Sequence, residues 1–206
     1  MPNRRQAWLR MAAVGAVPLA ASGLHLLARN APEPGNVAKV AAPPRDVCIF
    51  SPTFAWDGHS GGSMLAARAV PNDARCPVCG MFPARQPRWA VQVIYADGHA
   101  HFLDSPLSLF HYLQHVKRYA PGRRRAEISA IHVSEHESGR WLAAELALYI
   151  HGSTLVGPMG NGNLPATTAG EAASRLIERV GGQVLSFASL EGELPALLQA
   201  LAPHSH

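Results

Sequence analysis

The middle of the chain changes from a strand-like to a helical pattern of apolar residues and back again. Residues 89–95 (WAVQVIY) are rich in β-branched and aromatic types, and residues 99–103 (HAHFL) alternate polar and apolar positions. Asp97-Gly98 between these runs is a hairpin turn signal. A helical pattern follows, and residues 127–134 (EISAIHVS) then predict a third strand.

The helix between these strands is predicted over residues 107–119 (LSLFHYLQHVKRY). The segment 104–106 (DSP) supplies a capping side chain and a proline near the first helical position, and Pro121-Gly122 ends the helix. The predicted order is therefore ββαβ. The apolar face of this helix consists of Leu109, Phe110, Leu113 and Val116.

The second half of the chain repeats this order. Three further strands are predicted, over residues 147–150, 164–167 and 184–187. A capping box of Thr168 with Glu171 starts a helix that runs to Val180, where two glycines end it. The sequence thus predicts an α+β fold of two ββαβ units, assigned to residues 71–140 and to residues 141–206 with a C-terminal tail. A short amphipathic helix over residues 194–201 belongs to that tail.

The N-terminus predicts export. Arg4-Arg5 precedes an apolar run from Met11 to about Leu27, which is typical of a signal peptide or membrane anchor over residues 1–30. The paired arginines form a loose twin-arginine pattern. Residues 31–70, rich in Pro and Ala at first, predict a linker and an irregular arm. The body is therefore expected in the periplasm or on the outer face of the cytoplasmic membrane.

Charge argues against nucleic acid as a partner. The formal net charge is +4, but four arginines lie in the first thirty residues. Without that segment the chain has 14 basic and 14 acidic residues, and so no excess for a basic binding face. The cluster Arg123-Arg124-Arg125 after Pro121-Gly122 predicts a solvated turn.

The candidate chemistry lies in residues 75–82 (RCPVCGMF). Structural zinc needs four ligands, which Cys76 and Cys79 supply only together with His99 and His101 on the next hairpin. A thioredoxin-type redox pair needs a helix after the first cysteine, and the prolines that follow oppose one. A structural disulfide, with or without Cys48, is a third option in an oxidising compartment.

Met81 adds a fourth option. A thioether is a poor ligand for zinc and a good one for Cu(I), so two thiolates with Met81 make a soft site of low coordination number. Gly80 allows a tight turn that brings Cys79 and Met81 to one ion. A site of this kind on a loop suits a carrier, because ligand exchange releases the ion.

Three stretches together resemble the NosL family over about residues 71–190: CPVCGMF, RWAVQVIYADGHAHFLDSPLSLFHYL and ALYIHGSTLVGPMGNGNLPATTAGEAASRLIERVGGQVLSF. This family is identified with exported, often lipidated, copper-binding accessory proteins of nitrous oxide reductase, which carry Cu(I) for assembly of its copper-sulfide centre. The resemblance implies two ββαβ units with a topology similar to part of the organomercurial lyases. It places Cys79 and Met81 in the metal-binding CGM motif with Cys76 beside them, and it makes His101 and Met159, the latter from GPMG, further candidate ligands.

The chain departs from the family pattern at three places. Cys48 follows Arg45-Asp46-Val47, which is not a lipidation motif, and Leu109 stands where many members have a methionine. The arm with Cys48 and the stretch FAWDGHSGGSM is an addition, and Met64 and His59 within it are candidate replacement donors.

The expected function is therefore a non-enzymatic Cu(I) metallochaperone that delivers copper to a periplasmic copper enzyme such as nitrous oxide reductase, or to its assembly machinery. A dithiol-disulfide oxidoreductase and a structural zinc or disulfide module are the alternatives. The sequence has no phosphate-binding glycine loop, hydrolase elbow or paired carboxylates at an obvious cleft, and so favours no enzyme class.

Overall fold

The computed structural model describes residues 51–58 and 62–200. Contacts divide the chain into two parts, Met1–Pro43 and Pro44–His206, and every described residue belongs to the later part. The predicted signal segment, Cys48 and His59 lie outside the described residues. Within the described ranges, no helix combines the length and apolarity needed to cross a membrane.

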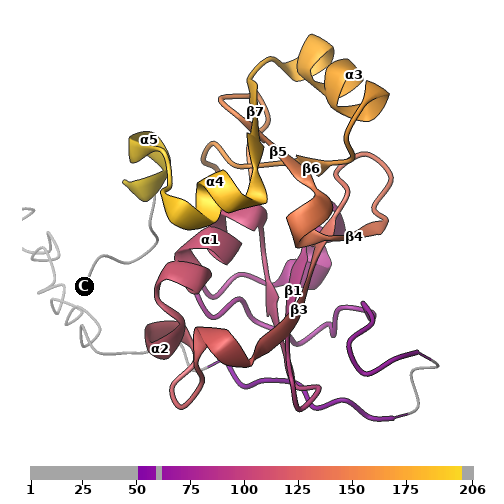
Figure 1. The fold of residues 1–206 in the computed structure, drawn as a ribbon, viewed down its shortest axis with the longest axis vertical. Helices are drawn as coiled ribbons and strands as arrows, with labels where there is room; N and C mark the ends of the chain where they lie inside the picture. Colours follow the sequence, from indigo (N-terminus) through magenta and orange to yellow (C-terminus); the bar gives the residue numbers. More distant parts are fainter. Residues whose placement is uncertain (1–50, 59–61, 201–206) are drawn as a thin grey trace, which may run out of the picture. The chain divides into compact units, whose positions relative to one another are not determined.

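The first half forms an antiparallel four-stranded sheet in the order β2-β1-β3-β4 (Figure 1). The predicted hairpin is present, because β1 pairs with β2 from Val91 opposite Leu103 to Ile94 opposite Ala100. Strand β4, which pairs with the end of β3, was not predicted, since three residues carry too little pattern. The strands are β1 (Val91–Tyr95), β2 (Ala100–Leu103), β3 (Ile128–Ser134) and β4 (Trp141–Ala143).

One helix was predicted between β2 and β3, and two are present. They are α1 (Pro106–Gln114) and α2 (Val116–Tyr119), separated at His115, whose φ of −135° and ψ of 42° are not helical. The predicted start is confirmed, because the Ser105 hydroxyl accepts a hydrogen bond from the Ser108 N–H and Pro106 follows the cap.

The second half forms a three-stranded sheet in the order β6-β5-β7. Its strands β5 (Leu148–His151), β6 (Ala166–Thr167) and β7 (Gln183–Ser186), with α3 (Glu171–Val180) between the last two, match the first unit in order and pairing. The two predicted ββαβ units are therefore present. Two short helices follow, α4 (Phe187–Gly192), which was not predicted, and α5 (Ala196–Gln199), which is shorter than predicted.

The predicted capping box of α3 is wrong. Gly170 occupies the cap position with a φ of +80°, and no side chain caps the helix. The left-handed conformation at Gly170 turns the chain into the helix, so the Thr168 hydroxyl is not used there.

The two units share one core around α1. The Phe110 ring lies 5.1 Å from the ring of Tyr149 on β5 and 5.5 Å from that of Phe187 on α4. The same cluster of buried side chains includes Cys76 and Cys79. The second ββαβ unit thus packs against α1, and the loop with Cys76 and Cys79 lies against the same core.

Residues 51–58 and 62–75 cover the other face of the first sheet. Phe54 pairs with Ala100 at the edge of β2, and the Gln92 side chain exchanges two hydrogen bonds with the backbone of Arg68. A second buried cluster lies beneath this arm, formed by Ala74, Ile94, Ala100 and Phe102. Both faces of β1 and β2 are therefore buried.

The triple arginine is only partly the solvated turn that was predicted. The exposed Arg124 pairs with nearby Glu127 at 2.9 Å. Arg123 pairs with Asp97 at 2.7 Å and lies over the Tyr95 ring, and Arg125 pairs with Glu191 at 2.6 Å. The carboxylates of Asp97 and Glu191 come from distant segments, which local sequence does not reveal.

Gly98 tests the packing of the arm on the hairpin. Its φ is +79°, and a Cβ there would lie 2.6 Å from the Met64 Cγ and 2.9 Å from the Trp56 Cβ. Gly139 has a φ of +73° and nothing within 4 Å of such a Cβ. We expect Gly139→Ala to lower the free energy of unfolding by about 1 kcal/mol from backbone strain, and Gly98→Ala by about 2–3 kcal/mol because the arm must also move. Urea unfolding measures both values, and equal losses would contradict the packing.

Candidate metal centre

The CxxCGM stretch folds into a closed loop. The Cys76 N–H donates to the Met81 carbonyl and the Gly80 N–H donates to the Cys76 carbonyl, both at 2.8 Å. Gly80 has a φ of +75°, which a side chain would oppose. The loop therefore depends on the glycine, as the sequence predicted.

This loop turns both thiols inward. Cys76 and Cys79 are free thiols with exposed fractions of 0% and 8%, while Met81 is 38% exposed. Of the three sulfur-bearing residues in the loop, Met81 is therefore the one that solvent reaches most.

A buried carboxylate completes the cluster. The Sγ atoms of Cys76 and Cys79 and a carboxylate oxygen of Asp104 all lie within 4.8 Å of one another. Asp104 stands between the end of β2 and the cap of α1, and neither of its buried carboxylate oxygens has a hydrogen-bond partner. A buried, unpaired carboxylate is costly unless it meets a proton or a cation, so its place beside two thiols makes these three residues a candidate metal site.

Sequence reasoning treated Asp104 only as part of a helix cap. Ser105 alone performs that role. The feature of the sequence that could have indicated the site is the position of Asp104 one residue before the cap, because its side chain is not needed there and can turn into the core.

Electrostatics keeps the Cys76 thiol protonated when no metal is bound. Burial, above all, raises the pKa of Cys76 well above its usual value, and the hydrogen bond with Cys79 and the charge of Asp104 raise it further. A backbone hydrogen bond from Asp104 acts in the opposite direction. Because thiolates are the ligands, a metal ion that enters this site must displace protons.

His101 was predicted as a ligand, but the structure gives it other partners. Its Nε2–H donates to the Ser51 carbonyl at 3.0 Å, and its Nδ1 accepts from the Tyr112 hydroxyl at 2.8 Å. The Tyr112 hydroxyl in turn bonds that of Tyr95. Both ring nitrogens are occupied, so His101 links the arm to the core instead of joining the thiols. His99 likewise bonds the Thr53 hydroxyl at 3.0 Å.

Met159 lies at the tip of a fixed loop. The loop closes by hydrogen bonds from Gly157 N–H to Asn161 O at 2.8 Å and from Gly160 N–H to Gly157 O at 2.9 Å. Met159 is 38% exposed.

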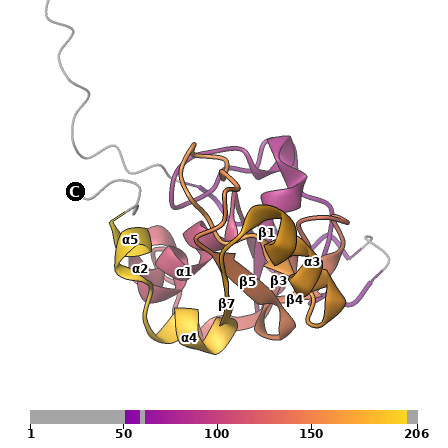
Figure 2. The same cartoon turned by 90° about the horizontal axis from the view of Figure 1, so that it is seen from above.

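Buried Asn163 ties this loop to α1. Its Oδ1 accepts from the Leu107 N–H, three residues after Asp104, at 3.2 Å. Figure 2 shows α1 from above, with α4 of the second ββαβ unit beside it. A Cβ on Gly157 would lie 2.3 Å from the Asn163 Nδ2, so the glycine of GPMG is required by this packing. The loop of Met159 is therefore held at the end of α1 that carries Asp104.

Met64, the replacement donor suggested by sequence, packs at the Gly98 turn of the hairpin. Leu109 is fully buried in the core around α1. The site residues that the structure brings together are Cys76 and Cys79, with Asp104 added.

Comparison with known protein families assigns the chain to one of them. The family model of NosL matches residues 67–195, and the chain belongs to the NosL family. Among solved structures, the crystal structure of the copper chaperone NosL from Shewanella denitrificans matches with a TM-score of 0.49 and 19% sequence identity, covering 60% of this chain and 94% of that chain. No curated protein matches the sequence.

The hydrogen-bonded His101 predicts a pH dependence of stability. Burial, opposed by the bond to Ser51, lowers its pKa to about 4. The unfolded chain binds a proton near pH 6.5, which the native protein does not bind until about pH 4, so stability is complete above pH 6.5 and falls as pH decreases through this window. We expect this residue to account for a loss on the order of 3 kcal/mol.

The test compares urea unfolding at pH 7 and pH 4.5 for the protein and for His101→Gln, whose amide still donates to Ser51. The variant should be less stable than the parent at pH 7, and its free energy of unfolding should fall less between pH 7 and pH 4.5. His111 and His136, whose pKa values are also lowered, contribute equally to this pH dependence in both proteins. An equal fall in the two proteins would contradict a neutral, buried His101.

Proposed function

We propose that this protein is an exported Cu(I) metallochaperone that delivers copper to a periplasmic copper enzyme, with nitrous oxide reductase as the client that the family resemblance implies. The observation that carries the proposal is the pair of buried thiols of Cys76 and Cys79 on a loop that also carries the exposed Met81. Membership of the NosL family supports it, as does the copper chaperone named among the solved structures.

The donor set favours a soft monovalent ion. Two thiolates satisfy Cu(I) at low coordination number, and Met81 supplies a third, exchangeable sulfur. Burial protects the cysteines from solvent, while the exposed thioethers of Met81 and Met159 offer positions from which an ion enters or leaves. Transfer then proceeds by ligand exchange, in which a donor of the partner replaces Met81 first and Cys79 next, with no change in the oxidation state of copper.

The alternatives fit the geometry less well. In a thioredoxin-type pair the attacking cysteine has a lowered pKa at a helix N-terminus. Here the pKa of Cys76 is raised, and the loop leads into the 3₁₀ turn Pro83–Arg85. A Cys2His2 zinc site would need His99 and His101, whose ring nitrogens bond Thr53, Ser51 and Tyr112.

Loss of one thiolate tests the site directly. We expect Cys79→Ser to weaken Cu(I) binding more than about a hundredfold, since even changes outside the ligand set cost 10–100-fold. The matched control is Cys48→Ser, which removes the one other cysteine and should leave the affinity unchanged. Competition of the reduced protein against a chromophoric Cu(I) chelator measures both, and equal affinity of Cys79→Ser and the parent would refute the site.

A substitution of Asp104 distinguishes a Cu(I) site from a Zn(II) site. A carboxylate is a hard donor that suits Zn(II) and adds little to Cu(I). We expect Asp104→Asn to weaken Zn(II) binding about tenfold or more and to change Cu(I) affinity less than about threefold. A parent protein that prefers Zn(II) over Cu(I) would instead support a structural zinc module.

A further inference from the structure

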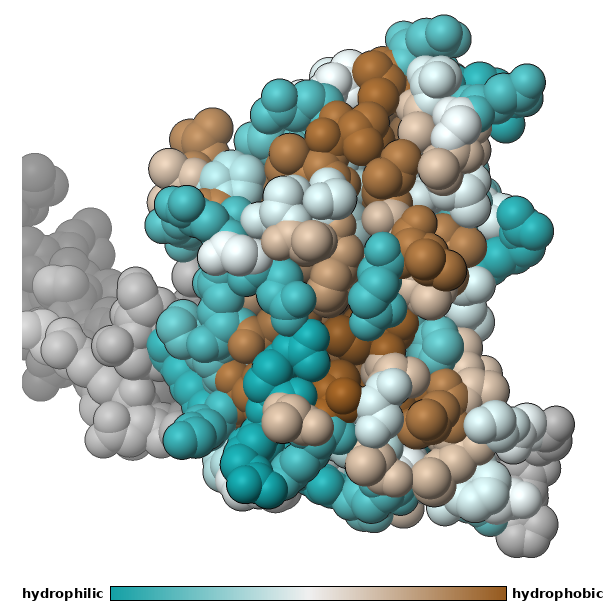
Figure 3. Space-filling view, in the orientation of Figure 1, coloured by the Kyte–Doolittle hydropathy of each residue, from teal (hydrophilic) through white to brown (hydrophobic). Residues whose placement is uncertain are grey.

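The described part of the chain carries one concentrated region of positive charge away from the metal centre. Five of the 18 Lys and Arg residues lie between Lys117 and Arg125, and no Asp or Glu lies between Asp104 and Glu127. In Figure 3 strongly hydrophilic residues gather over α2 and the segment that follows it, beside a small hydrophobic area. The copper proposal makes no use of this region.

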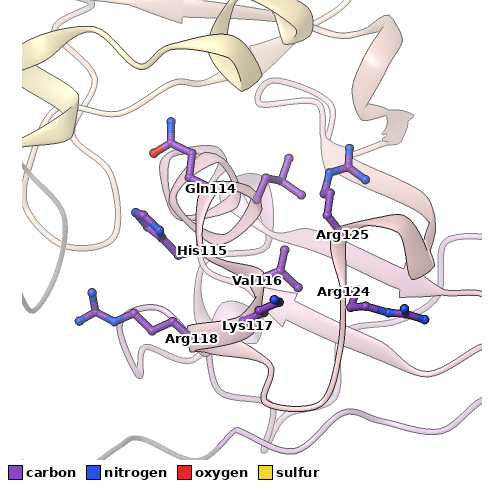
Figure 4. Close-up of a pocket in the computed structure, with 8 residues that line it drawn as sticks. Gln114, His115, Val116, Lys117, Arg118, Arg124 and Arg125 are labelled. Carbon is purple, nitrogen blue, oxygen red and sulfur yellow. The ribbon is translucent and has the colours of Figure 1, made fainter.

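All of these cationic residues except Arg123 line a hollow of about 410 Å³, which falls within the usual size range of small-molecule sites. It forms where the helix breaks at His115. In Figure 4 Arg124 and Arg125 lie on the side opposite Gln114 and His115, and Val116 and Lys117 lie between these two pairs. The lining consists of Leu113, Gln114, His115, Val116, Lys117, Arg118, Arg124 and Arg125, and includes no acidic residue.

The charge of the hollow is only partly neutralised. Glu127 pairs with Arg124 at 2.9 Å and Glu191 pairs with Arg125 at 2.6 Å. Both carboxylates belong to residues outside the lining. No ion pair or hydrogen bond holds Lys117 within the described residues. Lys117, Arg124 and Arg125 therefore face two carboxylates, and an anion that enters the hollow meets an excess of positive charge.

The shape and the donors together define the ligand. Guanidinium groups bind phosphate oxygens through paired hydrogen bonds, and an ammonium adds a point charge. Buried Leu113 and Val116 give the floor an apolar character that suits the organic part of a phosphate ester more than a bare inorganic ion. A flat acidic protein surface would not reach this floor.

We propose that the hollow beside α2 binds the phosphate group of an organic phosphate ester, with Lys117 and the guanidinium groups of Arg124 and Arg125 as its donors. Two sources share this chemistry: a soluble phosphomonoester and the headgroup of an anionic phospholipid. Binding at this site is independent of copper, because none of the lining residues belongs to the cluster of Cys76, Cys79 and Asp104.

The test uses the full chain and two charge reversals. Lys117→Glu places a negative charge in the hollow. Arg175→Glu makes the same change of net charge at an exposed position on α3, where Arg175 pairs with Glu171. Calorimetric titration with glycerol 3-phosphate tests the soluble source. Flotation with phosphatidylglycerol vesicles, compared with phosphatidylcholine vesicles, tests the lipid source and separates headgroup recognition from any apolar insertion.

We expect saturable binding to at least one of these probes that Lys117→Glu weakens about tenfold or more and that Arg175→Glu leaves within about twofold. Binding should also weaken as NaCl increases. Cu(I) affinity should be unchanged in both variants, which shows that each is folded. No binding to either probe, equal losses in the two variants, or binding of poly-glutamate in place of the phosphate probes would overturn the proposal.

Discussion

The burial of two thiols beside an unpaired carboxylate is the constraint on which the site depends. Cys76, Cys79 and Asp104 come from a loop and from the junction of β2 with α1, and their ligand atoms lie within 4.8 Å of one another. In the metal-free protein the raised pKa of Cys76 keeps its thiol neutral, so the cluster is tolerated inside the core. A soft cation would replace those protons, and the same burial would then shield the metal-bound sulfurs from solvent.

The fold supplies the rigidity that this cluster needs. The helix α1 carries Asp104 at its beginning, packs Phe110 against both Tyr149 and Phe187, and binds Asn163 of the Met159 loop. On the opposite face of the sheet Gln92 holds the arm through the backbone of Arg68, while His101, on the face of α1, bonds the Ser51 carbonyl. The two ββαβ units therefore meet at the helix next to the site, and the methionine loop of the second unit is held at the end of α1 that follows Asp104.

Local patterns allowed much of this to be predicted. The Asp97-Gly98 turn, the Ser105 cap and the repeated ββαβ order follow from turn chemistry and periodicity, and all three are present. The break at His115, strand β4 and the role of Asp104 were missed, because each depends on tertiary contacts. His101 shows the same limit: its spacing on the hairpin suggested a ligand, but Tyr112 and Ser51, distant in sequence, take both ring nitrogens.

If the thiolates of Cys76 and Cys79 hold Cu(I), X-ray absorption at the copper edge of the protein loaded with one equivalent of Cu(I) should detect them. We expect a shell of two or three sulfur atoms without oxygen or nitrogen at bonding distance, and one sulfur fewer in Cys76→Ser. A shell dominated by oxygen or nitrogen, or a spectrum unchanged by that substitution, would contradict the proposed site.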